Sequence, residues 1–213
     1  HTHTHTHTHT HSLSLSLSLS LSLSLALSLQ LASVSAVSTI LTALEEDFGP
    51  VTYAQGSMLT AALADGTEAA IKAAQGADVV VLALGLSALL EAEGRDRADL
   101  LLPEPQQLLL QNISQAVGAD KVVVVLNTAG CVDIDPALAK TILVAWYGGE
   151  ETGHGLADVI TGRVSPSGRL PLTFYTNDYL SLVNPVADFN LMTGKDNATG
   201  RTYRYVCKET NKE

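Results

Sequence analysis

Two patterns of hydrophobic residues alternate along most of the chain. Continuous runs of β-branched and aliphatic residues, such as Asp78–Leu84 and Lys121–Leu126, are typical of strands buried on both faces of a sheet. Elsewhere apolar residues recur at helical spacing, as Leu109, Ile113 and Val117 do, which predicts amphipathic helices. The predicted strands are Val51–Ala54, Asp78–Leu84, Lys121–Leu126, Thr141–Trp146 and Leu170–Phe174. The predicted helices are Thr39–Phe48, Thr67–Gln75, Pro103–Val117 and Glu150–Thr161, with a short one beginning at Asp135.

This alternation predicts an α/β fold with an open, mostly parallel sheet flanked by helices, an α/β sandwich. In sheets of this kind, sites form in the loops that leave the carboxyl ends of the strands. Three loops qualify, at residues 85–102, 127–135 and 147–151. Candidate chemistry is therefore expected in these loops.

The amino-terminal segment has a different pattern. Residues 1–11 alternate His and Thr, and residues 12–25 alternate Ser and Leu. Strict period two is the strand pattern, yet the Ser-Leu tract, at about 20 residues with its lapses, is far longer than a normal strand. A metal-chelating histidine face and a signal peptide are alternatives, and translated CA and TC dinucleotide repeats explain both tracts. We expect a disordered low-complexity segment at 1–38, one domain at 39–206 and a tail at 207–213.

The net charge of the chain limits the classes of function that it can have. The chain has 12 Lys and Arg against 22 Asp and Glu, a net charge of −10, and all of these residues lie after residue 44. Such an acidic domain lacks the basic face that nucleic acid requires. No apolar run is long enough for an ordinary membrane-spanning helix, and two cysteines cannot form a disulfide scaffold.

The loop after the buried run Asp78–Leu84 concentrates charge. Glu91, Glu93 and Asp96 lie within a few positions of Arg95 and Arg97. Neighbouring like charges raise the pKa of a carboxylic acid, whereas an adjacent Arg lowers it. The loop can therefore hold one proton-donating carboxyl and one carboxylate oriented by an ion pair. Composition does not say which is which, and a solvated charged loop is the alternative.

Three blocks of sequence resemble a known family. The first is E-x-E-G-x-D-R followed by L-x-L-P and paired glutamines, carried by Glu91, Glu93, Gly94, Asp96, Arg97, Leu100, Leu102, Pro103, Gln106 and Gln107. The second spans residues 145–175 and includes P-S-G-R-L-P, and the third is G-R-T-Y-R-Y at 200–205. Together they resemble the carboxy-terminal α/β domain of family 3 glycoside hydrolases, nearest the β-xylosidase and arabinosidase branch.

The resemblance implies a retaining β-glycosidase built from two domains. Its nucleophilic Asp belongs to an amino-terminal barrel, and its acid/base Glu comes from the domain resembled here. That role falls on Glu93, with Glu91 as the runner-up. Substrate-binding roles fall on Glu91, Asp96, Arg97 and Glu150. The role of Glu150 is the less typical one, because Gly148 stands where Pro is usual and Thr152 where Gly is usual.

The resemblance also implies partners and surroundings. The substrate would be a xylo- or gluco-oligosaccharide, as in xylan catabolism, without a metal or organic cofactor. The location would be secreted or extracellular. The barrel domain, together with the first strand and helix of the α/β domain, is expected to be missing, which leaves the sheet incomplete at its amino-terminal edge. We therefore expect a partial enzyme that is inactive alone. A non-catalytic carbohydrate-binding remnant or a pseudogene product is the alternative.

Overall fold

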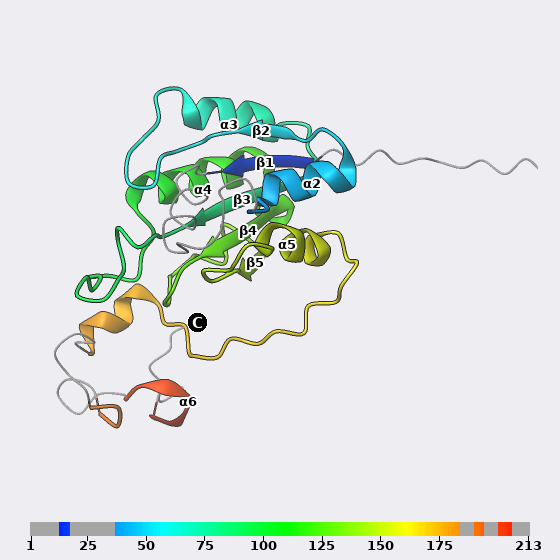
Figure 1. Ribbon diagram of the computed structural model, residues 1–213. Coiled ribbons are helices and arrows are strands. Elements are labelled where there is room, and N and C mark those ends of the chain that lie inside the picture. The colour runs from blue at the N-terminus through cyan, green and yellow to red at the C-terminus, as the bar shows by residue number, and fades with distance from the viewer. Residues whose placement is uncertain (1–12, 18–36, 184–189, 194–199, 206–213) are drawn as a thin grey trace, which may run out of the picture.

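A parallel β-sheet with helices on both faces forms the centre of the protein (Figure 1). This computed structural model describes residues 13–17, 37–183, 190–193 and 200–205. Within them the strands are β1 (Leu13–Leu17), β2 (Thr52–Ala54), β3 (Val79–Gly85), β4 (Val122–Asn127) and β5 (Thr141–Val144). Their order is β2-β1-β3-β4-β5, and every neighbouring pair is parallel. The predicted α/β class and parallel sheet are confirmed.

Two helical layers sandwich the sheet. The helices are α2 (Ile40–Phe48), α3 (Gly66–Ala74), α4 (Glu104–Val117), α5 (Thr152–Ile160) and α6 (Thr202–Tyr205), with 3₁₀ turns η2 (Ala119–Lys121) and η3 (Asn177–Ser181). Val80, Leu82 and Leu84 of β3 pack in the cluster that includes α3 and α4. Val81 and Ala83 pack in the cluster that includes α2 and α5. The fully apolar β3 is thus buried on both faces. None of the described helices is long and apolar enough to cross a lipid bilayer.

The Ser-Leu repeat takes part in this sheet. Leu13–Leu17 form β1, which lies between β2 and β3, with Ser14 opposite Thr52 on one side and Val80 on the other. This corrects the expectation that residues 1–38 stay outside the domain and that the sheet lacks its first strand. The physical reason is that a tract with strand periodicity can supply a strand from part of its length. Apart from β1, residues 1–36 lie outside the described part of the chain.

Two smaller predictions are wrong. Leu170–Phe174 form no strand, and Leu170 and Leu172 are 50% and 42% exposed. Pro171 has no N–H to donate to a ladder, which disfavours pairing at this position. The helix predicted at Asp135 is a turn only. It is closed by the Asp135 carbonyl, which accepts from the Leu138 N–H, and by the Asp135 carboxylate, which accepts from the Ala137 N–H.

A buried glutamine fixes the end of β3, from which the charged loop departs. The Gln106 side chain accepts from the Gly85 N–H at 2.7 Å and donates to the Gly85 and Leu59 carbonyls at 2.8 and 2.9 Å. Gly85 has a φ of 148°, and a Cβ there would lie 2.8 Å from the carbonyl carbon of Asn127. Glycine is therefore required at this point, and β3 ends in one defined direction.

Candidate functional site

The three loops predicted to carry chemistry meet at one carboxylate. Glu91 lies in the loop after β3, and its Oε1 accepts from the Ala129 N–H and from the Tyr147 hydroxyl, both at 2.5 Å. Ala129 follows β4, and Tyr147 follows β5. Parallel strands bring their carboxyl ends to one edge of the sheet, and Glu91 ties the three loops together there.

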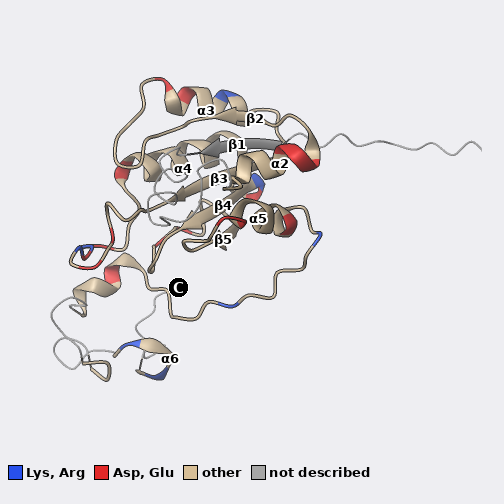
Figure 2. Cartoon of the chain, in the orientation of Figure 1, with Lys and Arg blue, Asp and Glu red and all other residues tan. Residues whose placement is uncertain are grey.

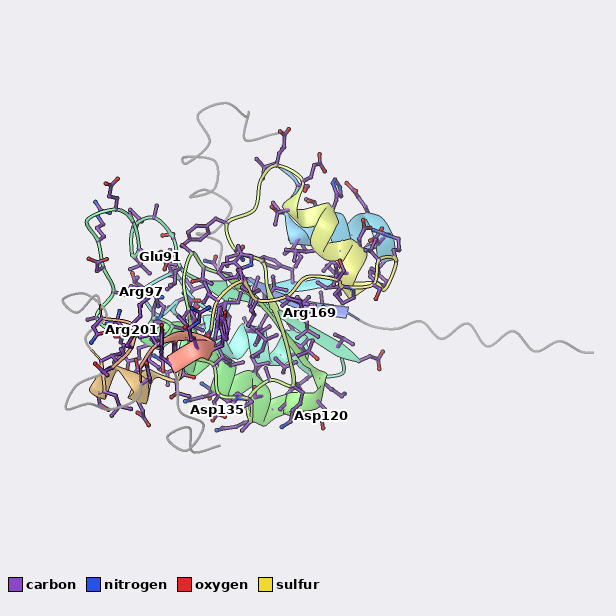
Figure 3. The ribbon with its side chains drawn as sticks, turned by 90° about the horizontal axis from the view of Figure 1, so that it is seen from below. Glu91, Arg97, Asp120, Asp135, Arg169 and Arg201 are labelled. Carbon is purple, nitrogen blue, oxygen red and sulfur yellow. The ribbon has the colours of Figure 1, made fainter. Side chains whose placement is uncertain are left out.

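An arginine completes this cluster from the same loop as Glu91. Arg97 Nε lies 3.2 Å from Glu91 Oε2, and Arg97 Nη2 donates to the Cys131 carbonyl at 2.6 Å. The side chains of Arg97 and Glu91 are only 16% and 11% exposed. A largely buried ion pair needs additional hydrogen bonds to offset desolvation, and Ala129 and Tyr147 provide them. Figure 3 shows Glu91 and Arg97 together at one end of the molecule, away from Arg169.

Tyr147 reaches the cluster through an unusual backbone. The preceding residue, Trp146, has a φ of 56°, in the left-handed region that bulky residues rarely adopt. The Trp146 ring packs edge-on against Phe174 with centroids 6.1 Å apart. Burial, and then the hydrogen bond to the Glu91 carboxylate, raise the pKa of Tyr147 above its usual value. Tyr147 thus stays protonated and donates.

Glu93 occupies the tip of a tight turn. Ala92 and Arg95 form an antiparallel bridge, in which the Arg95 N–H donates to the Ala92 carbonyl at 2.8 Å. Gly94, with a φ of 74°, supplies the left-handed residue that such a turn needs. Glu93 is exposed, and its carboxylate bonds to no group in the part of the chain that the structure describes. Its carboxylate is therefore available to a partner from outside these residues.

The other expected site residues divide into two groups. Asp96 is exposed on the same loop as Glu93, where acidic and basic residues alternate (Figure 2). Glu150 is exposed before α5, and its carbonyl accepts from the Ser38 N–H at 2.9 Å. Within the described residues, no hydrogen bond or ion pair joins the Glu150 carboxylate to the loop of Glu93. The structure thus brings Glu91 and Arg97 together and leaves Glu150 separate.

A second contact anchors the far end of the charged loop. The Leu100 N–H donates to the Asn177 side chain at 2.9 Å, and the Leu100 carbonyl accepts from the Asp133 N–H at 2.7 Å. The Asp133 carboxylate in turn accepts from the Asn177 N–H at 2.7 Å. The turn of Glu93 is therefore held at both ends. Sequence reasoning missed Tyr147 and Asn177, although Tyr147 lies in a loop that it did single out.

Comparison with known proteins places these blocks in one family. Residues 17–206 match the model of the glycosyl hydrolase family 3 C-terminal domain. A relative described as "Probable exo-1,4-beta-xylosidase bxlB", from Aspergillus fumigatus, is 38% identical over 176 residues, which are 81% of this chain and 22% of the relative. The beta-xylosidase/alpha-L-arabinofuranosidase 1 of Medicago sativa is 37% identical over 172 residues, 76% of this chain and 21% of its own. The chain thus spans about a fifth of these curated relatives.

Solved structures agree. A GH3 exo-beta-xylosidase (XlnD), in complex with a xylobiose aziridine probe, superposes with a TM-score of 0.77 at 28% identity, over 92% of this chain and 26% of its own. The GH3 beta-glucosidase of Bifidobacterium adolescentis gives a TM-score of 0.64 at 31% identity, over 78% of this chain and 25% of its own. Sequence and fold therefore converge, and the chain belongs to glycosyl hydrolase family 3, as a C-terminal domain of that family.

Proposed function

We propose that this domain supplies the acid/base carboxyl, Glu93, for hydrolysis of β-xylosides or β-glucosides with retention of configuration. The observation that carries the proposal is the contrast between two neighbouring carboxylates. Glu91 is largely buried and occupied by donors from three loops, whereas Glu93 is exposed at the tip of an anchored turn. The names of the relatives, xylosidases and glucosidases, support the substrate class.

Retaining hydrolysis uses two carboxyl groups on opposite sides of the glycosidic bond. In the first step, Glu93 gives its proton to the departing oxygen while a nucleophilic carboxylate attacks the sugar. In the second step, the Glu93 carboxylate takes a proton from water, which then displaces the nucleophile. The family resemblance assigns the nucleophile to a barrel domain, so Glu93 would act on a substrate held partly by that domain. Asp96 and Glu150 are proposed to contact the sugar.

A chimera tests this function. The α/β domain of the Aspergillus fumigatus bxlB relative is replaced by residues 13–206 of this chain, which include β1, and hydrolysis of xylobiose is compared with that of nitrophenyl xyloside. Glu93→Ala should slow xylobiose hydrolysis by about 10²–10⁴-fold, the usual contribution of a general acid. An activated nitrophenyl leaving group needs little protonation, so its departure should suffer less. Added azide should restore turnover with nitrophenyl xyloside and yield the β-xylosyl azide.

Controls separate the alternatives. Glu91→Ala should show a weaker leaving-group dependence than Glu93→Ala and no azide rescue, because the Glu93 carboxyl remains, and the reverse pattern would reassign the acid/base role to Glu91. The 213-residue chain without the chimera should release no xylose, because Glu93 provides only one of the two carboxyls. A carbohydrate-binding remnant would instead bind xylobiose, and the chimera would be inactive whether or not Glu93 is present.

A further inference from the structure

We propose that Tyr147 is a positioning residue for Glu93, acting through the hydrogen bond from its hydroxyl to Glu91. The inference rests on the proposed function in one respect only, that Glu93 is the group being positioned. The connection is short, because Glu91 precedes Glu93 by two residues and borders the Ala92–Arg95 turn. Whatever fixes the Glu91 carboxylate also fixes the base of that turn.

The first line of evidence is the role of Tyr147 in the carboxylate cluster. Glu91 Oε1 receives two donors at 2.5 Å, the Ala129 N–H and the Tyr147 hydroxyl. The only other described neighbour of that oxygen within hydrogen-bond reach is the Thr128 hydroxyl, at 3.4 Å. Removing the Tyr147 hydroxyl would therefore leave Oε1 with one short hydrogen bond and would detach the loop after β5 from the loop after β3.

The second line of evidence is the backbone that delivers Tyr147. Trp146 holds a left-handed φ of 56°, and strained conformations of this kind cluster at functional sites. Core packing does not explain the placement, because the Tyr147 side chain is only partly covered, at 38% exposed, and belongs to neither of the two hydrophobic clusters of the described residues. The hydroxyl contact with Glu91 is the interaction that this conformation secures.

A positioning role predicts that loss of the contact affects the charged loop more than the segment around Arg169. Loss of the Tyr147 hydroxyl should loosen the charged loop and leave both core clusters intact. When opening and closing are fast, proteolysis measures the population of the locally open state. Trypsin cleavage after Arg95, in the exposed turn, therefore reports on the loop, and cleavage after the exposed Arg169 serves as an internal reference.

The test uses the full chain with Tyr147→Phe. Cleavage after Arg95, relative to Arg169, should rise about tenfold, as expected for loss of one hydrogen bond to a charged group. Tyr179→Phe is the matched control, because it removes a hydroxyl that donates to the Gly200 carbonyl and should not affect Arg95. Unchanged Arg95 cleavage in Tyr147→Phe, or an equal rise in Tyr179→Phe, would overturn the proposal.

A spectroscopic readout tests the same contact independently. Glu91→Gln removes the negative charge that accepts from the Tyr147 hydroxyl, so the ¹³Cζ chemical shift of Tyr147, followed by NMR of labelled tyrosine near neutral pH, should change. An unchanged chemical shift would show that the two groups are not coupled and would contradict the proposal. Neither measurement depends on glycosidase activity. Failure here would leave the role of Glu93 in the chimera intact, and an inactive chimera would leave the Tyr147–Glu91 contact intact.

Discussion

At the scale of single residues, two departures from the usual family pattern explain each other. The family's usual form has Pro where this chain has Gly148, and Gly where it has Thr152. A Cβ at Gly148 would lie 2.8 Å from Cγ2 and 2.9 Å from Cβ of Thr152. The Thr152 side chain, whose hydroxyl donates to the Gly149 carbonyl at 2.7 Å, occupies the space that a side chain at 148 would need. In this chain the small residue stands at position 148 and the larger one at position 152, which reverses the family's usual arrangement.

This exchange predicts a strong coupling between the two positions. Gly148→Ala alone should destabilise the domain by about 1–3 kcal/mol, because the added methyl group overpacks against Thr152. The same change made together with Thr152→Gly should cost much less, so a double-mutant cycle by urea unfolding should give a coupling of about 0.5–3 kcal/mol. Additive effects would show that the two side chains do not compete for this space.

At the scale of elements, close packing of α5 against α2 depends on one of two glycines. A Cβ at Gly153 would lie 2.5 Å from the carbonyl carbon of Thr39 and 2.7 Å from the Ser38 carbonyl oxygen, whereas a Cβ at Gly155 meets nothing within 4 Å. Gly153 and Ala157, one turn apart, are the buried residues of α5. Glycine at position 153 lowers the helix propensity of α5, but a larger residue would collide with the backbone of Thr39 and Ser38.

The two glycines should respond to alanine in opposite directions. Gly155→Ala should stabilise the domain by about 0.5–1 kcal/mol through helix propensity alone. Gly153→Ala gains the same propensity but forces α5 away from Thr39, so a net loss of about 1–3 kcal/mol is expected. Thermal unfolding of both variants checks this, and equal shifts of the same sign would contradict the packing argument.

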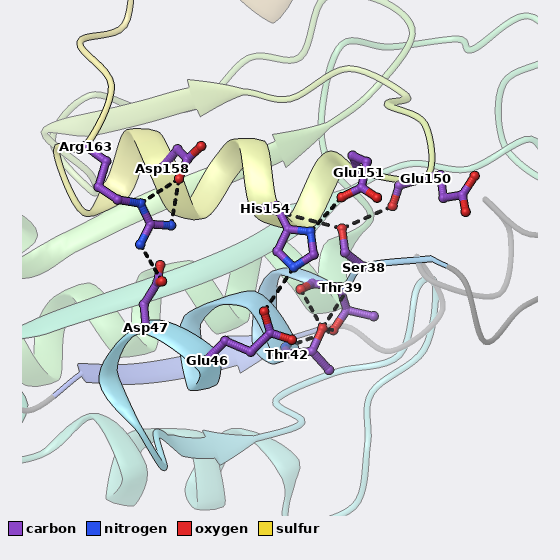
Figure 4. A network of polar contacts seen from close by, with 10 residues as sticks. All are labelled: Ser38, Thr39, Thr42, Glu46, Asp47, Glu150, Glu151, His154, Asp158 and Arg163. Atoms are coloured by element: carbon purple, nitrogen blue, oxygen red, sulfur yellow. Dashed lines mark hydrogen bonds and ion pairs between the residues drawn. The ribbon is translucent and has the colours of Figure 1, made fainter.

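Charged side chains add a second connection between the same two helices (Figure 4). His154 of α5 lies 2.6 Å from Glu151 and 3.1 Å from Glu46 of α2, and Ser38 Oγ accepts from its backbone N–H. Arg163 pairs with Asp158 and with Asp47 at the carboxyl end of α2. The hydrogen bond to Glu151, and then that to Glu46, raise the pKa of His154. The charged imidazolium is thus favoured in the folded state.

This shift predicts a pH dependence with a definite sign. A raised folded-state pKa contributes stability that is fully present below the unfolded value, about 6.5, and is lost as pH rises through the folded value. The urea midpoint of the wild type should therefore exceed that of His154→Gln below about pH 6.5, and the gap should shrink as pH rises above that value. Arg163→Gln is the control, because an arginine keeps its charge throughout this range. A gap that widens with rising pH would refute the assignment.

At the scale of the whole molecule, the sequence predicted the strands and helices that a local pattern encodes. It did not predict contacts that form only when loops distant in sequence come together. The valine runs of β3 and β4 and the apolar stripe of α4 can be recognised in the sequence, because burial dictates their composition. The contact of Tyr147 with Glu91 cannot be recognised in this way, because it joins residues 56 positions apart through loops without periodicity. Leu170–Phe174 has strand composition, yet whether such a segment pairs depends on its neighbours in space.

The place of β1 was hidden for a different reason. A helix or strand is usually found by where its pattern starts and stops, and the Ser-Leu tract has neither mark for many residues. Pattern alone could therefore not indicate which five residues lie between β2 and β3. The structure selects Leu13–Leu17, and this selection is made by pairing with two neighbouring strands rather than by any local signal.

That strand has an evolutionary consequence. The five-residue segment L-S-L-S-L begins at Leu13 and again at Leu15, Leu17, Leu19 and Leu21. A gene that gains or loses one Ser-Leu pair by replication slippage would still encode the same segment, and only the connection to α2 would change in length. Loop length is thermodynamically inexpensive, at about 0.6 kcal/mol per doubling. A class of mutation that elsewhere destroys a strand would here be nearly silent, and an unstable tract of DNA can persist inside a folded domain.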